Sequence, residues 1–196
     1  MGKIKSALEI AMERTESVAS DKSSIGQFEA KQKGKKLANE YLEGSLKSLE
    51  EELSKLDGEE RASLKQGIFD ILISQLTLPV VKDDMKRIET AGRGLNTLIG
   101  GKRFGDIAKQ MVGILNQYLD EAEQYEEAIK RQYAPKLHQK EEEISRRIGR
   151  HVKLDPFQDP EFVAFFNQNI NALKANYEGA VAQIREEATR LYEEKS

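Results

Sequence analysis

One apolar stripe runs at helical spacing through the middle of the chain, and it limits the fold more than any other feature of the sequence. Between Phe104 and Ile148 an apolar or aromatic side chain recurs every three or four residues, with no convincing helix stop. The mean step is about 3.7 residues, which is closer to a straight α-helix than to a left-handed coiled coil. A helix from about Arg103 to Gly149 would be roughly 70 Å long. Other helices must therefore lie along it.

Two features interrupt the stripe. Near Lys140 and Glu141 the helical spacing calls for an apolar side chain, but both residues are polar. Pro135 lacks an amide donor and clashes with the preceding turn, so the sequence predicts a kink or a break near Gln132 to Ala134.

A second long helix is predicted after a turn at Leu154 to Pro160. Asp159 followed by Pro160 is a strong helix start, because aspartate caps free amides and proline suits the first turn. Apolar residues then recur about every 3.6 residues as far as Leu191. The turn is short, so this helix is expected to fold back antiparallel along the first one, as in an αα-hairpin.

Four helices are predicted before this pair. The first covers residues 3–18, with apolar side chains on one face, and a polar loop at residues 20–26 follows it. The second covers residues 27–56. Asp57 and Glu60 are spaced as in a capping box and begin the third helix, which continues to about Leu78. The fourth carries apolar residues from Val81 to Ile99 and is weakened in the middle by Gly92 and Gly94.

The sequence therefore predicts an all-α protein, an elongated helical bundle of five or six helices with a long antiparallel C-terminal helix pair. A length of 196 residues with only four prolines fits a single domain, residues 1–196. Within it, residues 1–99 would form the N-terminal helices and residues 103–195 a long helical hairpin that serves as the spine.

Composition excludes several classes of function. The chain has no cysteine, so thiol catalysis, disulfides and cysteine-based metal sites are absent. His138 and His151 are too far apart to form a metal pair on one helix face, and neither completes a Glu-x-x-His motif. No catalytic, cofactor-binding or metal-binding residue is predicted, and the chain is not expected to be an enzyme. It has no membrane-spanning segment and is expected to be cytoplasmic.

The segment 91–106 is the most specialised part of the sequence. It combines five glycines with Arg93, Lys102 and Arg103. It fails as a phosphate loop, because Arg103 follows Gly101 and Lys102 where serine or threonine is required, and no strand precedes it. Two readings remain: a glycine hinge between two helices, and a small-anion site at Arg93, Lys102 and Arg103 at the start of the long helix.

Aromatic residues gather at the start of the last helix. Four of the seven phenylalanines in the chain are Phe157, Phe162, Phe165 and Phe166. We expect this Phe cluster, residues 157–166, to belong to the core. The alternative is an apolar pocket or a patch that contacts a partner.

The leading functional expectation is a non-enzymatic helical interaction or scaffold protein that binds a protein partner or forms a homodimer. It rests on the length of the predicted spine, which the rest of the chain is too short to cover. Small-ligand or anion binding is the first alternative. Nucleic-acid binding is the second, through basic clusters at Lys31 to Lys36 and Arg146 to Lys153, although a net charge of -3 does not favour it.

Overall fold

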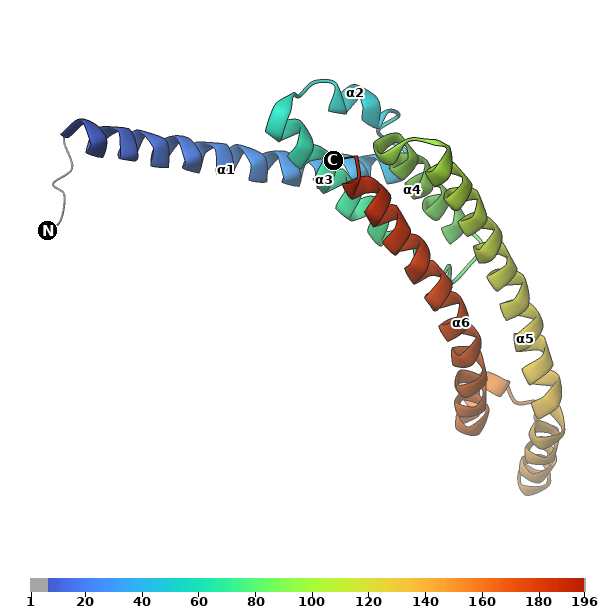
Figure 1. Ribbon diagram of the computed structural model, residues 1–196. Coiled ribbons are helices and arrows are strands. Elements are labelled where there is room, and N and C mark those ends of the chain that lie inside the picture. Colours follow the sequence, from blue (N-terminus) through green and yellow to red (C-terminus); the bar gives the residue numbers. More distant parts are fainter. Residues whose placement is uncertain (1–6, 196) are drawn as a thin grey trace, which may run out of the picture. The chain divides into compact units, whose positions relative to one another are not determined.

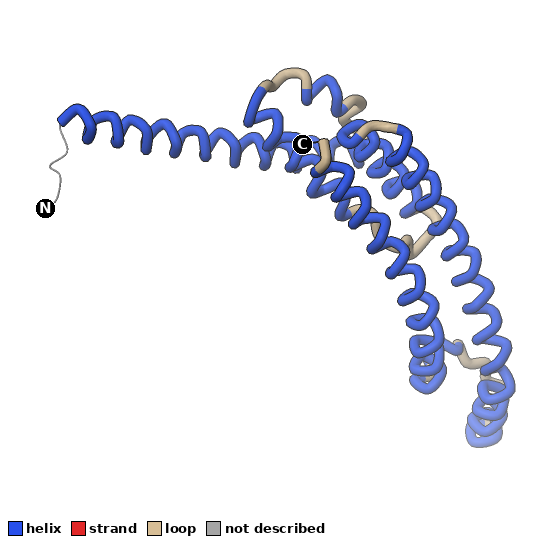
Figure 2. The backbone as a smooth tube through the Cα atoms, in the orientation of Figure 1, coloured by secondary structure: helices blue, strands red, loops and turns tan. Residues whose placement is uncertain are grey.

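The protein is mostly helical in the part that the computed structural model describes, which is the backbone of residues 7–195 and the side chains of residues 24–195 (Figure 1). In chain order the helices are α1 (Ala7–Leu42), α2 (Leu49–Leu53), α3 (Gly58–Ser74), α4 (Asp84–Ile99), α5 (Lys102–Ile148), the 3-10 helix η1 (Pro156–Gln158) and α6 (Pro160–Glu193). No strand occurs in residues 7–195 (Figure 2). The predicted all-α class is confirmed.

The chain divides into two compact units that alternate along the sequence. Unit 1 contains Met1–Leu76, Arg87–Gly105 and Ala188–Ser196, and unit 2 contains Thr77–Lys86 and Asp106–Glu187. Helices α4, α5 and α6 each contribute residues to both units. The sequence instead divided the chain between residues 99 and 103, and its assignment of a single domain stays a prediction.

Unit 1 is organised around a contact between α1 and α3 at which two glycines lie against the backbone of the opposite helix. A Cβ atom added at Gly34 would be 2.1 Å from the carbonyl oxygen of Leu64, and one added at Gly67 would be 2.1 Å from that of Lys31. Earlier along both helices, the amide of Gln27 donates to Glu59 at 2.8 Å. Successive contacts thus advance along both helices in the same direction, so α1 and α3 pack in parallel.

Apolar side chains surround this glycine contact and form the core of unit 1. They include Ala30, Leu37 and Ala38 from α1 and Leu64, Ile68 and Leu72 from α3, all buried. Helix α4 comes close as well, because a Cβ atom at Gly94 would lie 2.7 Å from Leu72 Cδ1. The rings of Phe69 and Tyr192 stack with their centroids 4.0 Å apart, which joins the end of α6 to α3.

Unit 2 contains the predicted antiparallel helix pair. Tyr118 of α5 lies against Tyr177 of α6, with ring centroids 5.2 Å apart, and Tyr133 lies against Phe162 at the same distance. Later residues of α5 therefore meet earlier residues of α6. This arrangement confirms the predicted hairpin, and α5 has nearly the bounds that the stripe predicts.

Polar side chains of α5 tie down the turn between α5 and α6. The backbone N–H of Leu154 donates to Glu141 Oε1 at 2.8 Å, and that of Val152 donates to Ser145 Oγ at 3.0 Å. Lys140 Nζ reaches both oxygens of Asp159, at 2.9 and 2.7 Å. The two polar positions in the stripe, Lys140 and Glu141, thus supply hydrogen-bond partners to the turn between α5 and α6. The peptide groups of that turn need such partners.

The predicted helix boundaries before α5 are wrong in several places. Helix α1 continues through residues 20–26, where a loop was predicted, because polar residues alone do not stop a helix. It ends at Leu42, inside the predicted helix 27–56, where Gly44 takes a positive φ of 80° that favours glycine. The side chain of Asp57 makes no capping hydrogen bond. The predicted apolar face of residues 3–18 lies outside the described side chains.

Helix α5 continues through Pro135, so the predicted break is wrong, and the kink that was its alternative stays a prediction. Helix α4 is continuous through Gly92 and Gly94, and the weakness predicted there stays a prediction. Pro79 neither starts nor kinks a helix, because α3 has ended at Ser74 and α4 begins at Asp84. The turn at residues 154–160 contains the short helix η1, although the sequence predicted no regular structure there.

Candidate functional site

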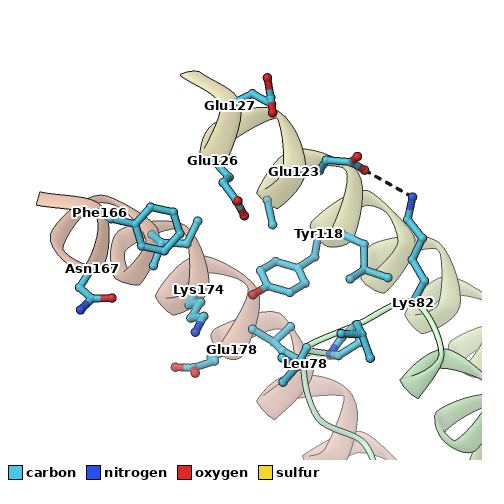
Figure 3. A pocket seen from close by; sticks show the side chains of 16 residues that line it. Leu78, Lys82, Tyr118, Glu123, Glu126, Glu127, Phe166, Asn167, Lys174 and Glu178 are labelled. Atoms are coloured by element: carbon cyan, nitrogen blue, oxygen red, sulfur yellow. Dashed lines mark hydrogen bonds and ion pairs between the residues drawn. The ribbon is translucent and has the colours of Figure 1, made fainter. Parts of the chain in front are cut away.

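An open pocket of about 670 Å³ lies within unit 2. Its walls are the loop Leu78 to Lys82, one face of α5 from Tyr118 to Glu127 and one face of α6 from Phe166 to Glu178. We call it the unit 2 pocket. In Figure 3 the rings of Tyr118 and Phe166 point into the space between the two helices.

The loop wall of the unit 2 pocket exposes two adjacent apolar side chains. Val80 is 88% exposed and Val81 is 55% exposed, although the preceding Pro79 is buried. Asp84, at the start of α4, fixes this conformation, because its Oδ2 accepts the backbone N–H of Val80 at 2.8 Å and that of Val81 at 3.0 Å. These hydrogen bonds hold the pKa of Asp84 below its usual value. Asp84 therefore fixes the loop in a conformation that leaves both valines exposed to solvent.

The floor of the pocket is aromatic and uncharged. Burial raises the pKa of Tyr118, and the nearby carboxylate of Glu178 raises it further. Burial, together with a hydrogen bond to Glu121, raises the pKa of Tyr177, the ring beneath Tyr118, to about 12. Both phenols therefore stay neutral near pH 7, and neither has the lowered pKa expected of a catalytic base or nucleophile.

Carboxylates dominate the rim of the pocket along α5. The lining of the unit 2 pocket and of a shallower neighbouring pocket together includes five carboxylates and three cations. The carboxylates are Asp120, Glu123, Glu126, Glu127 and Glu178, and the cations are Lys82, Arg131 and Lys174. Lys82 lies 3.4 Å from Glu123 across the mouth, as the dashed line in Figure 3 shows. The rim therefore carries an excess of negative charge.

A second group of polar side chains lies at the end of the hairpin and is saturated with internal contacts. Asp159 is 8% exposed and accepts hydrogen bonds from Lys140, from Tyr133 Oη at 3.0 Å and from the backbone N–H of Glu161 at 3.1 Å. Lys140 also pairs with Glu161. Lys140 lowers the pKa of Asp159, and both carboxylates raise that of Lys140. Every carboxylate of the group has a partner, so it braces the fold and offers no reactive group.

The four predicted phenylalanines come together in one aromatic cluster beside Tyr133. Phe157 lies edge-on to Phe162 at 5.2 Å and to Phe166 at 5.3 Å, and Phe162 is completely buried. Phe165 packs against the same group. Phe157 is 44% exposed, and Phe166 also lines the unit 2 pocket. Phe162 belongs to the core, Phe165 and Phe166 are partly buried against it, and the role of the cluster as a partner contact stays a prediction.

The predicted anion site has a different set of neighbours from those expected. Lys102 and Arg103 are exposed at the start of α5, but Arg93 donates to Thr90 Oγ1 at 2.8 Å on its own helix. Gly100 and Gly101 form the turn with positive φ angles of 65° and 88°. Lys195 Nζ donates to the carbonyl of Gly100 at 3.2 Å, a contact that no spacing in the sequence indicated. Anion binding here stays a prediction.

Part of each predicted basic cluster forms internal ion pairs. Lys31 lies 2.9 Å from Asp70, and Arg147 lies 2.8 Å from Glu143. Gly34, in the middle of the first cluster, is in contact with α3. Nucleic-acid binding through these clusters stays a prediction. Within residues 24–195, no three histidine or acidic side chains lie close enough together to hold a metal ion, and no helix is long and apolar enough to cross a membrane.

The chain belongs to DUF6657, a family of unknown function, whose family model matches residues 50–190. The matched segment contains the whole unit 2 pocket, the aromatic cluster and the polar group at the end of the hairpin. No curated protein and no solved structure matches the chain.

Proposed function

We propose that this family member is a non-enzymatic, cytoplasmic protein-binding module, which holds an apolar segment of a protein partner in the unit 2 pocket. The observation that carries the proposal is the pair Val80 and Val81, 88% and 55% exposed at the mouth of a pocket with an aromatic floor. Single exposed apolar residues are ordinary on protein surfaces. Two adjacent valines, fixed by Asp84 beside an open pocket, form a continuous apolar surface of the kind that partners cover.

The energetics favour binding over catalysis. Covering one fully exposed valine side chain contributes about 1.5 kcal/mol, and the pocket adds the partly exposed ring of Phe166. The titratable groups around the pocket are carboxylates at its rim, lysines and neutral phenols. Neither phenol has the lowered pKa that proton transfer at neutral pH requires. The arrangement supports recognition of an apolar segment.

Site-specific photo-crosslinking tests the proposal. A benzophenone amino acid at position 81 of the full chain is expected to form an adduct with one protein in cells. The same group at Gln139, an exposed position of α5 outside the pocket, should form none. The protein captured, once purified, should bind the wild-type chain and lose at least about tenfold in affinity for the Val80→Ser/Val81→Ser variant. Equal crosslinking at positions 81 and 139 would overturn the proposal.

The double serine variant is a clean control because it removes only exposed methyl groups. Its thermal midpoint and circular dichroism should match those of the wild type, since exposed substitutions change stability by about 0.5 kcal/mol or less. Self-association, the other expectation from the sequence, is checked with light scattering during size-exclusion chromatography. A mass twice that of the single chain would identify a homodimer.

A further inference from the structure

The charges around the unit 2 pocket restrict the chemistry of its occupant. This inference rests on the function proposed above and adds the identity of the partner segment. We infer that the pocket binds an amphipathic helix whose apolar stripe is flanked by lysine or arginine residues.

The shape of the pocket favours a helix. Its α5 wall extends from Tyr118 to Glu127, which is a helical length of roughly 14 Å. A partner helix of about the same length presents apolar side chains at positions i, i+4 and i+7 on one face. Those side chains would meet Val81, Leu119 and Ile170, which line three sides of the pocket.

The sign of the rim charge favours a basic flank. Along α5, Asp120, Glu123 and Glu127 line the neighbouring pocket, and the two glutamates also line the unit 2 pocket. Their cationic neighbours satisfy them only in part, since Lys82 lies 3.4 Å from Glu123 and Arg131 lies 3.8 Å from Glu127. Among the described side chains, Asp120 and Glu178 form no ion pair. A lysine or arginine beside the apolar stripe of the partner would form ion pairs with these carboxylates.

The same charges argue against the other occupants. An acidic helix would place its carboxylates beside those of α5, and like charges at an interface cost affinity. A nucleic acid would bring phosphates to the same rim. A second copy of the chain remains distinguishable by experiment, because its own residues 1–22 contain Lys3, Lys5 and an apolar helical pattern.

Three synthetic helices test the inference against the full chain by fluorescence anisotropy. The first has leucine at i, i+4 and i+7 with lysine flanks, the second has glutamate flanks, and the third is a scramble of the first. We expect only the lysine helix to bind, and its affinity should fall about tenfold between low and high salt. Its affinity should also fall about tenfold for Glu123→Lys/Glu127→Lys, which reverses two rim charges.

Matched variants make the result specific. Glu142→Lys/Glu143→Lys changes two exposed carboxylates of the same helix outside the unit 2 pocket, and it should bind the lysine helix as the wild type does. Val80→Ser/Val81→Ser should abolish binding of the same helix. A fourth probe, a peptide of residues 1–22, tests whether a second copy of the chain occupies the pocket.

Each outcome separates the inference from the function on which it rests. If the lysine and glutamate helices bind equally and both depend on Val80 and Val81, the pocket binds proteins but the basic partner is wrong. If the peptide of residues 1–22 binds more tightly than the lysine helix, the occupant is another copy and the inference fails. If no helix binds in a manner that depends on the valines, both the inference and the proposed function fail.

Discussion

Two glycines determine how closely α1 and α3 approach each other. Any side chain at Gly34 would meet a backbone carbonyl, which moves less easily than a side chain, at 2.1 Å. We therefore expect Gly34→Ala to lower the free energy of unfolding by about 2 kcal/mol, in the range measured for overpacked interiors. Urea denaturation followed by circular dichroism measures the change.

Gly113 and Gly179 provide the matched control for that substitution. Both lie inside helices, and an added Cβ atom would meet nothing within 4 Å at either position. Gly113→Ala and Gly179→Ala should therefore stabilise the protein by about 0.5 to 1 kcal/mol, because alanine loses less backbone entropy than glycine on folding. A stability gain of the same size for Gly34→Ala would contradict the close contact of α1 and α3.

Asp159 should make the protein sensitive to acid. The folded protein holds the pKa of this carboxyl below its ordinary value, chiefly through Lys140. A lowered pKa contributes stability above the unfolded value of about 3.9, and this contribution is lost as the pH falls through the folded value. Asp159→Asn should therefore cost about 2 kcal/mol at pH 7.

The pH dependence separates charge from packing at this position. The difference in unfolding free energy between the wild type and Asp159→Asn should shrink when urea denaturation is repeated at pH 3, because protonation of the unfolded carboxyl below its pKa of about 3.9 removes part of the stability that the charge contributes. A difference that is equal at both pH values would show that the shape of the side chain matters and its charge does not.

At the scale of single helices, Pro135 is a weak point that α5 tolerates. The helix continues through this exposed residue, although proline removes one intrahelical hydrogen bond and crowds the preceding turn. Pro135→Ala should therefore raise the free energy of unfolding by roughly 1 to 3 kcal/mol. Thermal denaturation measures this, with Gln139→Ala, an exposed substitution of the same helix, as the control. A loss of stability would mean that Tyr133 needs a bend at Pro135 to reach Phe162.

The helices that the sequence predicted best are those with the longest apolar stripes. In α5 and α6 the stripe extends over many turns, so local errors do not change the assignment, and Asp159 with Pro160 marks the start of α6. The earlier boundaries failed because leucines continue past Leu42 into α2, which concealed the turn at Gly44. Gly94 was predicted to weaken α4, because the residues that pack against it, Leu72, Tyr41 and Leu49, belong to other helices.

The candidate site was less predictable than the helices. The aromatic cluster was predicted because its phenylalanines are neighbours in sequence. The unit 2 pocket was not, because its walls come from three distant segments, and Val81 was expected in a helix when it lies in an exposed loop. One signal was available: Pro79 directly before two valines and two aspartates is unusual inside a helix.

For the molecule as a whole, the division into two units predicts separate opening reactions. Regions of a protein that share few contacts can open locally with different free energies. Gly34→Ala should therefore speed amide hydrogen exchange in residues 58–74 of unit 1 and leave residues 129–144 of unit 2 unchanged. Mass spectrometry of peptides from both regions measures the two rates. Equal acceleration in both regions would mean that the units open together.

The pairing of Gly34 with Gly67 links the segment that matches the family to a part of the chain outside it. Gly67 lies inside the matched segment, residues 50–190, and Gly34 lies before it. The missing side chain at position 67 matters only while the backbone of α1 lies in contact with α3. Relatives with glycine there should carry an equivalent of α1, and relatives that have lost α1 are free to place a larger residue at that position.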